Sequence, residues 1–465
     1  MSLDLGHMQA FVRRVHFVGI GGVGMSGIAE VLANLGYRVS GSDLKESAIT
    51  RRLKAAGVRV ALGHAAANVR DAQVVVVSSA VRPDNPEVRA ARHAGVPIVL
   101  RAQMLAELGR MKKTMTVAGS HGKTTTTAMA AMALAAAGAE PTMIVGGQIK
   151  NIDSNARLGL GDYLVTEADE SDGSFVHLEP LVAVVTNIDN DHLDHHKTMD
   201  NLRAAFAAHL SRLPFYGAAV LCADDPGLAL LRPRLNARVI SYGFSRRADW
   251  QARALRLDKD GSSYEAFYLG RRVARIRLRV PGRHNVLNSL AALAAGRFLG
   301  FPLSGLGRGL AAFRGVGRRL DRLGSAGEVE FVDDYGHHPT EVRAAVEAVA
   351  TLWKGRRTVV VFQPHRYSRT KLLAGEFGPA FSRADLVFVM DIYPAGEAPI
   401  PGVSSALILD SLRRAKVACA PCTGSLDVLR QLRRGDVVLT LGAGDVWKTG
   451  MDLLRRLQTD LASPV

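Results

Sequence analysis

The chain has 465 residues, of which 48% are hydrophobic and 22% charged, so its length and composition predict a globular protein of roughly three domains. No apolar run is long enough to span a bilayer and the N-terminus lacks the basic and apolar regions of a signal peptide, so we exclude a membrane-spanning or secreted protein and expect a cytoplasmic one. The net charge of +16 comes from scattered residues without an aromatic-rich RNA-binding pattern, which favours several phosphate-bearing small molecules over nucleic acid as partners.

The first predicted unit is a strand, a glycine-rich turn, a helix and a second strand. Residues 15–20 are mostly apolar, the turn has the pattern Gly19-x-Gly21-x-x-Gly24, and Asp43 ends the second strand. We expect a diphosphate on the N-terminus of this helix, with the Asp43 carboxylate accepting hydrogen bonds from ribose hydroxyls. The pattern fits NAD, FAD and a nucleotide sugar equally well, and a βαβ unit that binds no ligand is the alternative.

Three short β-branched runs continue the α/β alternation to about Leu108, where we expect the first domain to end. The runs are residues 58–61, 74–78 and 98–100. His64 follows the first run, Ser78 ends the second and Ser79 comes next. Because ligands bind at the carboxyl ends of strands in such sheets, these side chains are candidate ligand contacts. A histidine on the protein surface is an equally good interpretation of His64.

The chain is organised around residues 117–138, VAGSHGKTTTTAMAAMALAAAG. An apolar, threonine-rich strand leads into this stretch, and a helix rich in Ala and Met begins at its Lys-Thr pair. In this arrangement backbone N–H groups and the helix N-terminus face the phosphates of ATP or GTP. Lys123 then reaches the β- and γ-phosphates, and the Thr124 hydroxyl is a Mg²⁺ ligand. Val117 stands where the general pattern has a glycine, so an ordinary glycine-rich turn is the alternative.

Carboxylates crowd behind the next predicted strand, residues 163–166. They are Glu167, Asp169, Glu170 and Asp172. A Mg²⁺ ligand is expected at this place in a phosphate-loop domain, and Glu167 comes first, so it is the predicted ligand. A solvated acidic loop is a weaker interpretation, because an acidic cluster beside a triphosphate costs free energy unless a cation neutralises it.

A segment dense in Asn, Asp and His follows the predicted strand at residues 182–186. Its spacing is not that of a zinc module. We therefore predict that His192 holds a second Mg²⁺ or Mn²⁺ ion beside the ATP site. His195 and His196 are predicted to lie on the surface.

Polar side chains also mark the last third of the chain. A helix is predicted after Pro281, and the amides of Asn285 and Asn288, one turn apart, suit the edge of an adenine. A third α/β unit is predicted from about Phe313, with polar residues at the carboxyl ends of its strands. These residues are Asp334, Tyr335, His337, His338, His365, Arg366, Arg369 and Tyr393. Several histidines at strand ends indicate a site, and the arginines suit a carboxylate or a phosphate.

Two nucleotide-type sites and a third rim of Arg and His constrain the chemistry. A nicotinamide oxidoreductase explains only the first site, and a nucleic-acid-associated ATPase explains only the second. A ligase that activates a nucleotide-bound carboxylate with ATP explains all three, so it is the leading hypothesis.

The chain resembles the Mur ligase family in motifs that cover nearly its whole length. The motifs are GIGGVGMSGIAEVL, GSHGKTTTT, TEADESDGSF, TNIDNDHLD, GRHNVLN, FRGVGRRLD, DDYGHHPTE, FQPHRYSRT and YPAGEAPI. The resemblance implies an α/β fold of three domains. They are a Rossmann-like UDP-sugar-binding domain at 1–108, a central ATP-binding P-loop domain at 109–314, and a Rossmann-like C-terminal domain at 315–465 that binds the amino acid and closes on ATP.

Within the family, the first-domain and third-domain motifs resemble the branch that joins L-alanine to the lactyl carboxylate of UDP-N-acetylmuramate. That resemblance implies ATP and Mg²⁺, an acyl-phosphate intermediate, and a place in peptidoglycan precursor synthesis. It also implies a monomer or weak homodimer with no nucleic-acid or membrane partner. The nearest alternative is the branch that attaches a murein tripeptide to the same UDP sugar.

The resemblance also implies the following roles for individual residues. Catalytic roles fall on Lys123, His192, His337, Arg366 and Arg369, and metal binding on Thr124, Glu167 and His192. ATP binding falls on Gly119, Ser120, His121, Gly122, Lys123, Thr124, Thr125, Asn288, Arg319 and Asp334. Binding of the UDP sugar and alanine falls on Gly21, Gly22, Gly24, Met25, Ser26, Asp43, His64, Ser78, Ser79, Glu170, Ser171, Tyr335, His337 and His338.

Two positions depart from the family pattern. Several Mur ligases carry a carbamylated lysine about fifteen residues after the metal-binding histidine, whereas Phe206 stands near that place here. We therefore predict no carbamyl-lysine. Asp445 stands where amide side chains are common in relatives.

Overall fold

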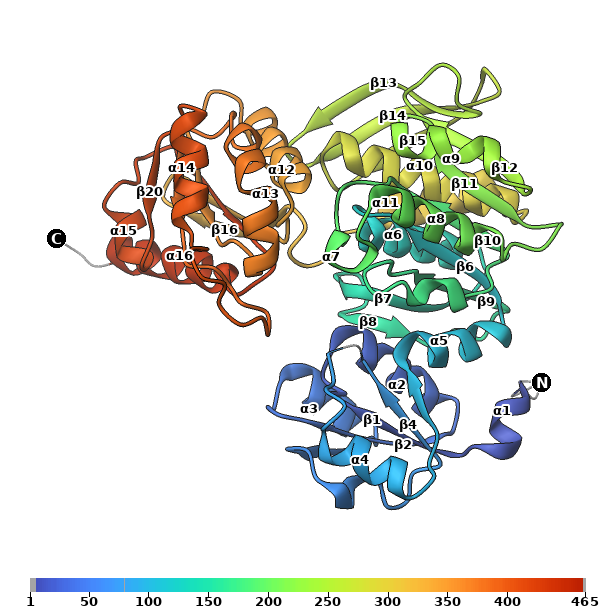
Figure 1. The fold of residues 1–465 in the computed structure, drawn as a ribbon. Coiled ribbons are helices and arrows are strands. Elements are labelled where there is room, and N and C mark those ends of the chain that lie inside the picture. The colour runs from blue at the N-terminus through green and yellow to red at the C-terminus, as the bar shows by residue number, and fades with distance from the viewer. Residues whose placement is uncertain (1–5, 79, 463–465) are drawn as a thin grey trace. The chain divides into compact units, whose positions relative to one another are not determined.

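The computed structural model describes residues 6–78 and 80–462 (Figure 1). Contacts divide the chain into two compact units. The first unit contains Met1–Leu255, Ser263–Leu278 and Asn285–Arg314, and the second contains Arg256–Ser262, Arg279–His284 and Gly315–Val465. Three sheets build these units, and α-helices cover them, as the prediction of a three-domain α/β fold requires.

The N-terminal sheet has five parallel strands in the order β3-β2-β1-β4-β5. Its strands are β1 (Arg14–Val18), β2 (Arg38–Asp43), β3 (Arg59–Leu62), β4 (Val74–Val77) and β5 (Ile98–Leu100). Its helices are α1 (Gly6–Phe11), α2 (Val23–Asn34), α3 (Ala48–Ala55), α4 (Pro86–His93) and α5 (Arg101–Arg110), with the 3-10 turn η1 (Ala66–Val69). Valines from β4, β1 and α4 form an apolar core on one face of the sheet.

The second sheet has ten strands in the order β15-β14-β13-β12-β11-β10-β6-β9-β7-β8. The strands are β6 (Lys113–Ala118), β7 (Thr142–Ile149), β8 (Ser154–Arg157), β9 (Tyr163–Glu167), β10 (Val182–Val185), β11 (Ala218–Cys222), β12 (Arg238–Gly243), β13 (Trp250–Asp258), β14 (Gly261–Tyr268) and β15 (Arg271–Leu278). The helices are α6 (Lys123–Ala136), α7 (Leu193–His196), α8 (Met199–Leu210), α9 (Pro226–Leu231), α10 (Arg283–Phe298) and α11 (Leu303–Ala312), with η2 (Ser174–His177) and η3 (Arg232–Arg234).

The N-terminal sheet is joined to the second sheet by contacts within the first unit. Helix α2 packs on β7 and β8, where a Cβ added to Gly27 would lie 3.2 Å from Ile144 Cγ2. The Asn155 amide donates to the carbonyl of Val23 at 2.9 Å and accepts from the Arg52 guanidinium at 2.6 Å. These bonds hold the helix that follows the glycine turn against the sheet that carries the phosphate loop.

The sheet of the second unit has the order β16-β17-β21-β18-β19-β20, and only β16 runs antiparallel. Its strands are β16 (Asp321–Ala326), β17 (Val329–Asp334), β18 (Thr358–Phe362), β19 (Leu386–Val389), β20 (Cys419–Pro421) and β21 (Val437–Leu441). Its helices are α12 (Pro339–Leu352), α13 (Tyr367–Ala380), α14 (Ala406–Arg414), α15 (Ser425–Leu429) and α16 (Val446–Ala462). Two separate apolar cores show that both faces of this sheet are covered, as in a doubly wound fold.

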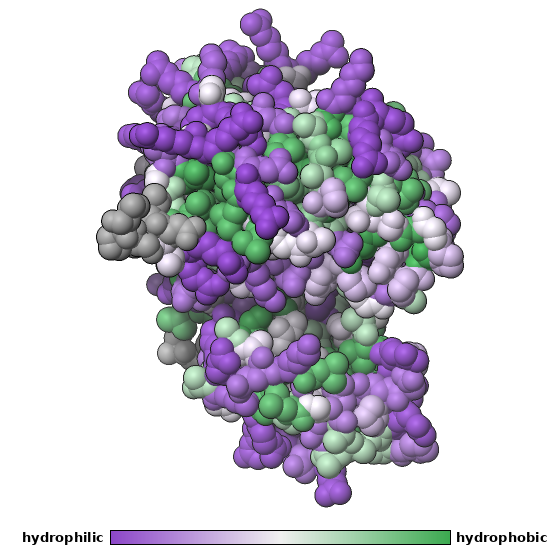
Figure 2. Space-filling view, turned by 90° about the vertical axis from the view of Figure 1, so that its left-hand side faces the viewer, coloured by the Kyte–Doolittle hydropathy of each residue, from purple (hydrophilic) through white to green (hydrophobic). Residues whose placement is uncertain are grey.

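Charged and apolar side chains alternate on the molecular surface (Figure 2). Figure 2 shows long hydrophilic side chains over much of the face that it presents, with apolar patches between them. Within the described part of the chain, no helix combines the length and the apolar character that a bilayer crossing requires.

Helix α6, which begins at the phosphate loop, packs against α11 through backbone contacts. A Cβ added to Gly309 would lie 2.4 Å from the carbonyl oxygen of Met132 and 2.6 Å from Ala133 Cα. One turn earlier, a Cβ on Gly305 would lie 2.8 Å from Ala137 Cα. The two helices therefore approach more closely than larger side chains permit.

Gly309→Ala is expected to lower the free energy of unfolding by about 1–3 kcal/mol, because the new methyl group overpacks this contact. Gly307→Ala in the same helix is the matched control. Its Cβ would meet only Ile276 Cδ1 at 3.6 Å, so helix propensity predicts a gain of up to about 1 kcal/mol. Urea unfolding of both variants measures the difference, and equal stabilities would contradict the close approach.

Candidate active site

The glycine turn of the first unit lies where the sequence predicts, at the carboxyl ends of β1 and β2. The backbone N–H of Gly21 donates to Asp43 Oδ2 at 2.8 Å, so one Asp43 oxygen holds the turn itself. Met25 and Ser26 are buried in α2, and the Ser26 hydroxyl donates to the carbonyl of Val23. Gly22 and Gly24, also predicted, lie in the turn and at the start of α2. Of the predicted pair after β4, Ser78 is partly buried and Ser79 lies outside the described residues.

A buried carboxylate that sequence analysis did not identify lies beneath this edge of the sheet. Glu87 is fully buried in α4, and its Oε2 accepts from the Ser42 hydroxyl at 2.6 Å. Its Oε1 accepts from the Asn68 amide at 2.5 Å and from the backbone N–H of Ala65 at 3.3 Å. Ser42 also contacts His64 Nδ1 at 2.9 Å, so Glu87 anchors a predicted ligand contact.

Burial alone would raise the pKa of Glu87, but hydrogen bonds from His16, Ser42 and Asn68 outweigh it and hold the pKa at about 2. Because the folded-state pKa lies below the unfolded one, this carboxylate stabilises the fold above about pH 4.5 and loses that effect as the pH falls towards 2. Glu87→Gln is expected to lower the free energy of unfolding at pH 7 by at most about 3 kcal/mol. Urea titrations should show this deficit shrinking between pH 4.5 and 2.5, whereas a deficit independent of pH would contradict the ionised state.

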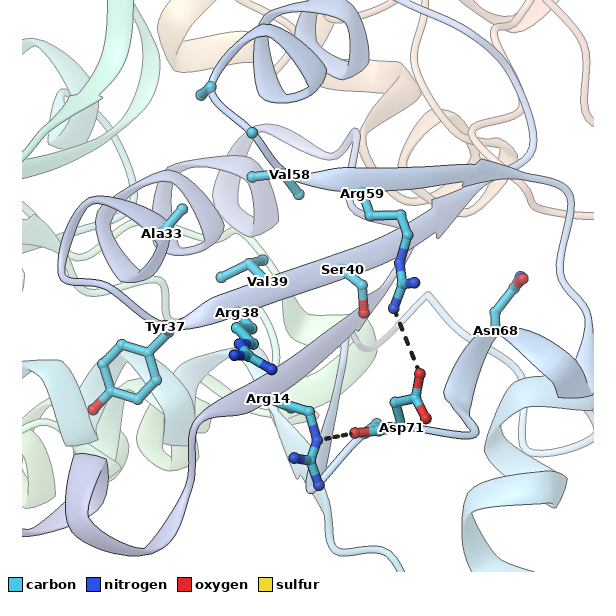
Figure 3. A pocket seen from close by; sticks show the side chains of 13 residues that line it. Arg14, Ala33, Tyr37, Arg38, Val39, Ser40, Val58, Arg59, Asn68 and Asp71 are labelled. Carbon is cyan, nitrogen blue, oxygen red and sulfur yellow. Dashed lines mark hydrogen bonds and ion pairs between the residues drawn. The ribbon is translucent and has the colours of Figure 1, made fainter.

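The opposite edge of the same sheet carries a pocket of about 630 Å³ (Figure 3). Arg14, Arg38 and Arg59, which begin β1, β2 and β3, line it, and Arg59 pairs with Asp71 at 3.8 Å. The predicted site residues lie at the carboxyl ends of the strands, so the pocket is separate from them.

The phosphate loop connects β6 to α6, as predicted, and the end of β10 fixes its shape. Gly119 and Gly122 have φ values of 127° and 82°, which favour glycine. The backbone N–H of His121 donates to the Asn187 side chain at 2.8 Å, and His121 Nε2 lies 2.8 Å from Asp189 Oδ2. Asp189 is a loop contact that sequence analysis did not assign. The loop residue Ser120 accepts from the backbone N–H of Asp189 at 2.9 Å, and Thr125 is buried in α6.

Lys123 lies at the centre of the loop. Its Nζ donates to the carbonyl of Gly119 at 2.7 Å and to Glu170 Oε1 at 2.8 Å. Burial raises the pKa of Glu170 to about 7 despite the attraction of Lys123. The carboxylates of the acidic loop raise the pKa of Lys123 despite burial, so the lysine stays charged. Ser171, a predicted substrate contact in the same loop, is partly buried. The lysine predicted to meet the phosphates is thus held by a carboxylate.

The donor groups beside Lys123 fit a magnesium ion. The Thr124 hydroxyl donates to Glu167 Oε2 at 3.2 Å, which places the two predicted ligands together. Burial raises the pKa of Glu167, and Glu170 Oε2 is buried without a hydrogen-bond partner among the described residues. Hard carboxylate and hydroxyl oxygens with too few cationic partners are the donor set that Mg²⁺ prefers.

His192 lies near the same acidic loop in a left-handed conformation, with φ of 57°. Lys123 and Arg101, with a smaller contribution from His192, lower the pKa of Asp169 despite burial. The surface prediction for His196 is wrong: the side chain is buried, and its Nε2 contacts the carbonyl of Glu170 at 2.8 Å. His195 is exposed, as predicted.

Arg101 links the glycine turn to the acidic loop, a role that sequence analysis did not detect. Its Cδ would lie 3.1 Å from a Cβ on Gly24, and its guanidinium lies 3.7 Å from Asp169 Oδ2. Asn288, the predicted adenine contact, also lies at the loop, because its Oδ1 is 3.0 Å from the position of a Cβ on Gly122. Phe206 is fully buried and packs edge-on against Phe175.

The polar residues of the second unit gather at the carboxyl ends of its strands. The Tyr335 ring lies under the guanidinium of Arg319 at 5.0 Å and beside the His337 ring at 5.6 Å. The His365 ring lies 5.4 Å from the His337 ring and stacks on Tyr393 at 5.7 Å. These four rings form one continuous row at the carboxyl ends of the strands, where the sequence indicates a site.

Asp334 and His338 are built into the backbone around that row. The Asp334 carboxylate accepts from the backbone N–H groups of Gly336 at 2.7 Å and Leu320 at 2.8 Å, and burial raises its pKa to about 6. His338 caps α12, where its Nδ1 accepts from the backbone N–H of Thr340 at 3.3 Å. Both side chains therefore order the turn before α12.

Arg366 and Arg369 begin α13 beside the row of rings. Arg366 has a φ of 70°, a costly conformation for a residue with a Cβ, and its N–H donates to the carbonyl of Tyr393 at 2.9 Å. Arg369 donates to His365 Nδ1 at 3.4 Å. Strained backbone persists only where the surrounding structure maintains it, and it is often found at functional sites.

Comparison with known proteins identifies the relatives of this chain. Residues 14–113 match the Mur ligase family, catalytic domain; residues 117–296 match the Mur ligase middle domain; and residues 318–444 match the Mur ligase glutamate ligase domain. Curated relatives named UDP-N-acetylmuramate--L-alanine ligase include one from Geobacter sp. (strain M21), 50% identical over 97% of this chain and 99% of its own length. Another, from Anaeromyxobacter sp. (strain Fw109-5), is 51% identical over 96% of this chain and 98% of its own length.

Solved structures show the same architecture. The UDP-N-acetylmuramate-alanine ligase from Thermotoga maritima superposes with a TM-score of 0.82 at 30% identity and covers 96% of this chain and 99% of that one. A murein peptide ligase from Psychrobacter arcticus superposes with a TM-score of 0.72 at 22% identity, over 96% of this chain and 99% of that one, and so shares the fold.

Proposed function

The chain belongs to the Mur ligase family, and we propose that it joins L-alanine to the lactyl carboxylate of UDP-N-acetylmuramate at the expense of ATP. The observation that carries this proposal is the identity of about half of all residues with L-alanine ligases over nearly the whole chain. The phosphate loop, the glycine turn and the row of rings supply the three sites that the reaction needs.

The proposed reaction has two steps. A carboxylate does not acylate an amine in water, so the lactyl carboxylate first attacks the γ-phosphate of ATP to give an acyl phosphate. The alanine amine then attacks that carbonyl, and phosphate leaves from the tetrahedral intermediate. Lys123 stabilises the charge of the transferring phosphoryl group, and Arg366 and Arg369 orient carboxylate or phosphate groups. His337 or His338 is the proposed base that takes the proton of the amine.

Thr124, Glu167 and His192 are the residues proposed to hold magnesium. When bound, Mg²⁺ neutralises the charge of the ATP phosphates. The remaining predicted residues complete the proposal: the glycine turn, Asp43 and His64 bind the UDP group, Asn288 binds the adenine, and Arg319 with Asp334 binds the nucleotide from the C-terminal domain. We further propose domains at 1–108, 109–314 and 315–465, a monomer or weak homodimer, and a cytoplasmic location where ATP and nucleotide sugars occur.

The alternative is the attachment of a murein tripeptide to the same UDP sugar. It is less favoured, because the curated relatives at about 50% identity over nearly the whole chain are named as L-alanine ligases, whereas two murein peptide ligase structures are 22% and 30% identical to this chain. The two activities share the ATP and UDP-sugar chemistry, so only the identity of the amine separates them.

Phosphate release from Mg·ATP tests the proposal, with UDP-N-acetylmuramate present and the amine varied. We expect release that depends on both the UDP sugar and L-alanine, with little release from the murein tripeptide. Release with the tripeptide as the only effective amine would show that the chain has the alternative activity. Release that does not depend on the UDP sugar would contradict the assignment of the glycine turn.

A further inference from the structure

We propose that Glu87, acting through Ser42, is a positioning residue that fixes His64 in the tautomer whose Nε2 accepts a hydrogen bond. His64 would then read an N–H or O–H donor of the uridine group rather than an acceptor. This inference rests on the proposed function, because it takes the uridine diphosphate to lie at the carboxyl ends of β1, β2 and β3.

Glu87 must accept every hydrogen bond that reaches it. Its side chain is fully buried, and its two oxygens accept hydrogen bonds from the Ser42 hydroxyl, the Asn68 amide and the backbone N–H of Ala65. Two imidazole nitrogens also lie near Oε2, His64 Nδ1 at 3.4 Å and His16 Nε2 at 3.5 Å. An ionised carboxylate has no proton to donate. The low pKa of Glu87 agrees with this geometry.

The Ser42 hydroxyl has one hydrogen, which it donates to Glu87 in a hydrogen bond. Ser42 Oγ lies 2.6 Å from Glu87 Oε2, a distance that two oxygens reach only with a proton between them. The contact of 2.9 Å between Ser42 Oγ and His64 Nδ1 therefore needs its hydrogen from the imidazole. In a neutral imidazole, Nδ1–H leaves Nε2 as a lone-pair acceptor.

Nε2 of His64 is the nitrogen available to a ligand. The side chain is 17% exposed, and the described residues supply no hydrogen-bond partner to Nε2. The preceding residue, Gly63, donates to the carbonyl of Asp43, which ties the His64 loop to the end of β2. The ring thus lies next to the turn proposed to bind the diphosphate.

His16 provides an internal comparison on the same carboxylate. Its Nδ1 lies 2.9 Å from Ser40 Oγ, and its Nε2 lies 3.5 Å from Glu87 Oε2. The nearby carboxylate favours a proton on Nε2 of His16, which is the opposite tautomer to that of His64. Two histidines around one carboxylate are therefore expected to differ in which nitrogen carries hydrogen.

Long-range ¹H–¹⁵N NMR of histidine-labelled full-length protein at pH 8 tests the tautomers, with His64→Gln used to assign the signal. We expect His64 protonated at Nδ1 in the unmodified chain. In Glu87→Gln the amide oxygen accepts the hydrogen bonds from Asn68 and Ala65. The amide NH₂ group then donates to the Ser42 oxygen, and the Ser42 hydroxyl donates its hydrogen to His64 Nδ1 instead. The proton should therefore move to Nε2. A wild-type His64 protonated at Nε2 would overturn the inference, and this result needs no variant to fold.

Calorimetric binding of UDP and its N3-methyl, 2′-deoxy and 3′-deoxy analogues tests the contact. One analogue should bind wild type about tenfold more weakly than UDP, as expected for one lost hydrogen bond, and should lose nothing further in His64→Ala. The analogue affected tells whether the imide N–H or a ribose hydroxyl is the donor. No binding of UDP to wild type would contradict the proposed function itself. UDP binding with the same analogue penalties in wild type and His64→Ala would overturn only this inference.

Discussion

Lys123→Met is expected to lower kcat by about a thousandfold or more while the chain still folds. The lysine Nζ lies within 2.8 Å of both a loop carbonyl and Glu170, in the loop proposed to bind the ATP phosphates, where its charge would stabilise the transferring phosphoryl group. Methionine keeps most of the side-chain volume but removes the charge and the two hydrogen bonds that Nζ donates. Single-turnover phosphate release measures the loss, and a loss below tenfold would contradict the assigned role.

The stability of the same variant has a separate expectation. Removing one partner of a buried ion pair costs up to about 3–5 kcal/mol, because the other charge remains buried. Glu170 limits this cost by taking up a proton, since the loss of Lys123 raises its pKa further. The matched variant Lys123→Met with Glu170→Gln should recover stability in urea without recovering activity. A double variant no more stable than Lys123→Met would show that the pair contributes little.

Arg366→Ala is expected to lower kcat/KM for the amino acid by about a hundredfold or more, because a charged donor at the site is lost. Arg366→Gly should be equally inactive yet more stable than Arg366→Ala by about 1 kcal/mol. The reason is the φ of 70°, which glycine adopts without strain. Thermal unfolding and phosphate release on both variants separate the two effects.

Lys416→Gly is the matched control for Arg366. Lys416 also has a positive φ, of 58°, but follows α14 in a part of the chain without predicted site residues. Its replacement should raise stability by up to about 1 kcal/mol and leave activity unchanged. Equal stability of Arg366→Gly and Arg366→Ala, with a gain in Lys416→Gly, would mean that the backbone at Arg366 is not strained.

Local signals in the sequence were sufficient for the sheets and for the loops that follow them. The strand predicted at residues 98–100 matches β5, and the phosphate loop lies between β6 and α6 as expected. These predictions succeed because β-branched runs, glycines at positive φ and a Lys-Thr helix start act within a few residues of each other. The resemblance to the Mur ligases then assigned roles to the polar residues at the strand ends.

The parts that the sequence did not reveal depend on partners far along the chain. His196 was predicted to be exposed, but it is buried by a contact with Glu170, 26 residues away. The bond between His121 and Asp189 spans 68 residues, and that between Glu87 and Ser42 spans 45. A glutamate in the first turn of a helix usually faces solvent, so neither its position nor its neighbours indicated that Glu87 is buried.

The close approach of α6 and α11 limits which residues can replace the glycines of α11. Helix α11 carries none of the proposed catalytic residues, yet two of its positions admit no side chain beyond a hydrogen atom without displacing α6. A rigid-body shift of α6 would also move Lys123, because α6 begins at the phosphate loop. One face of a helix without catalytic residues is therefore restricted to glycine at two positions by its contact with α6.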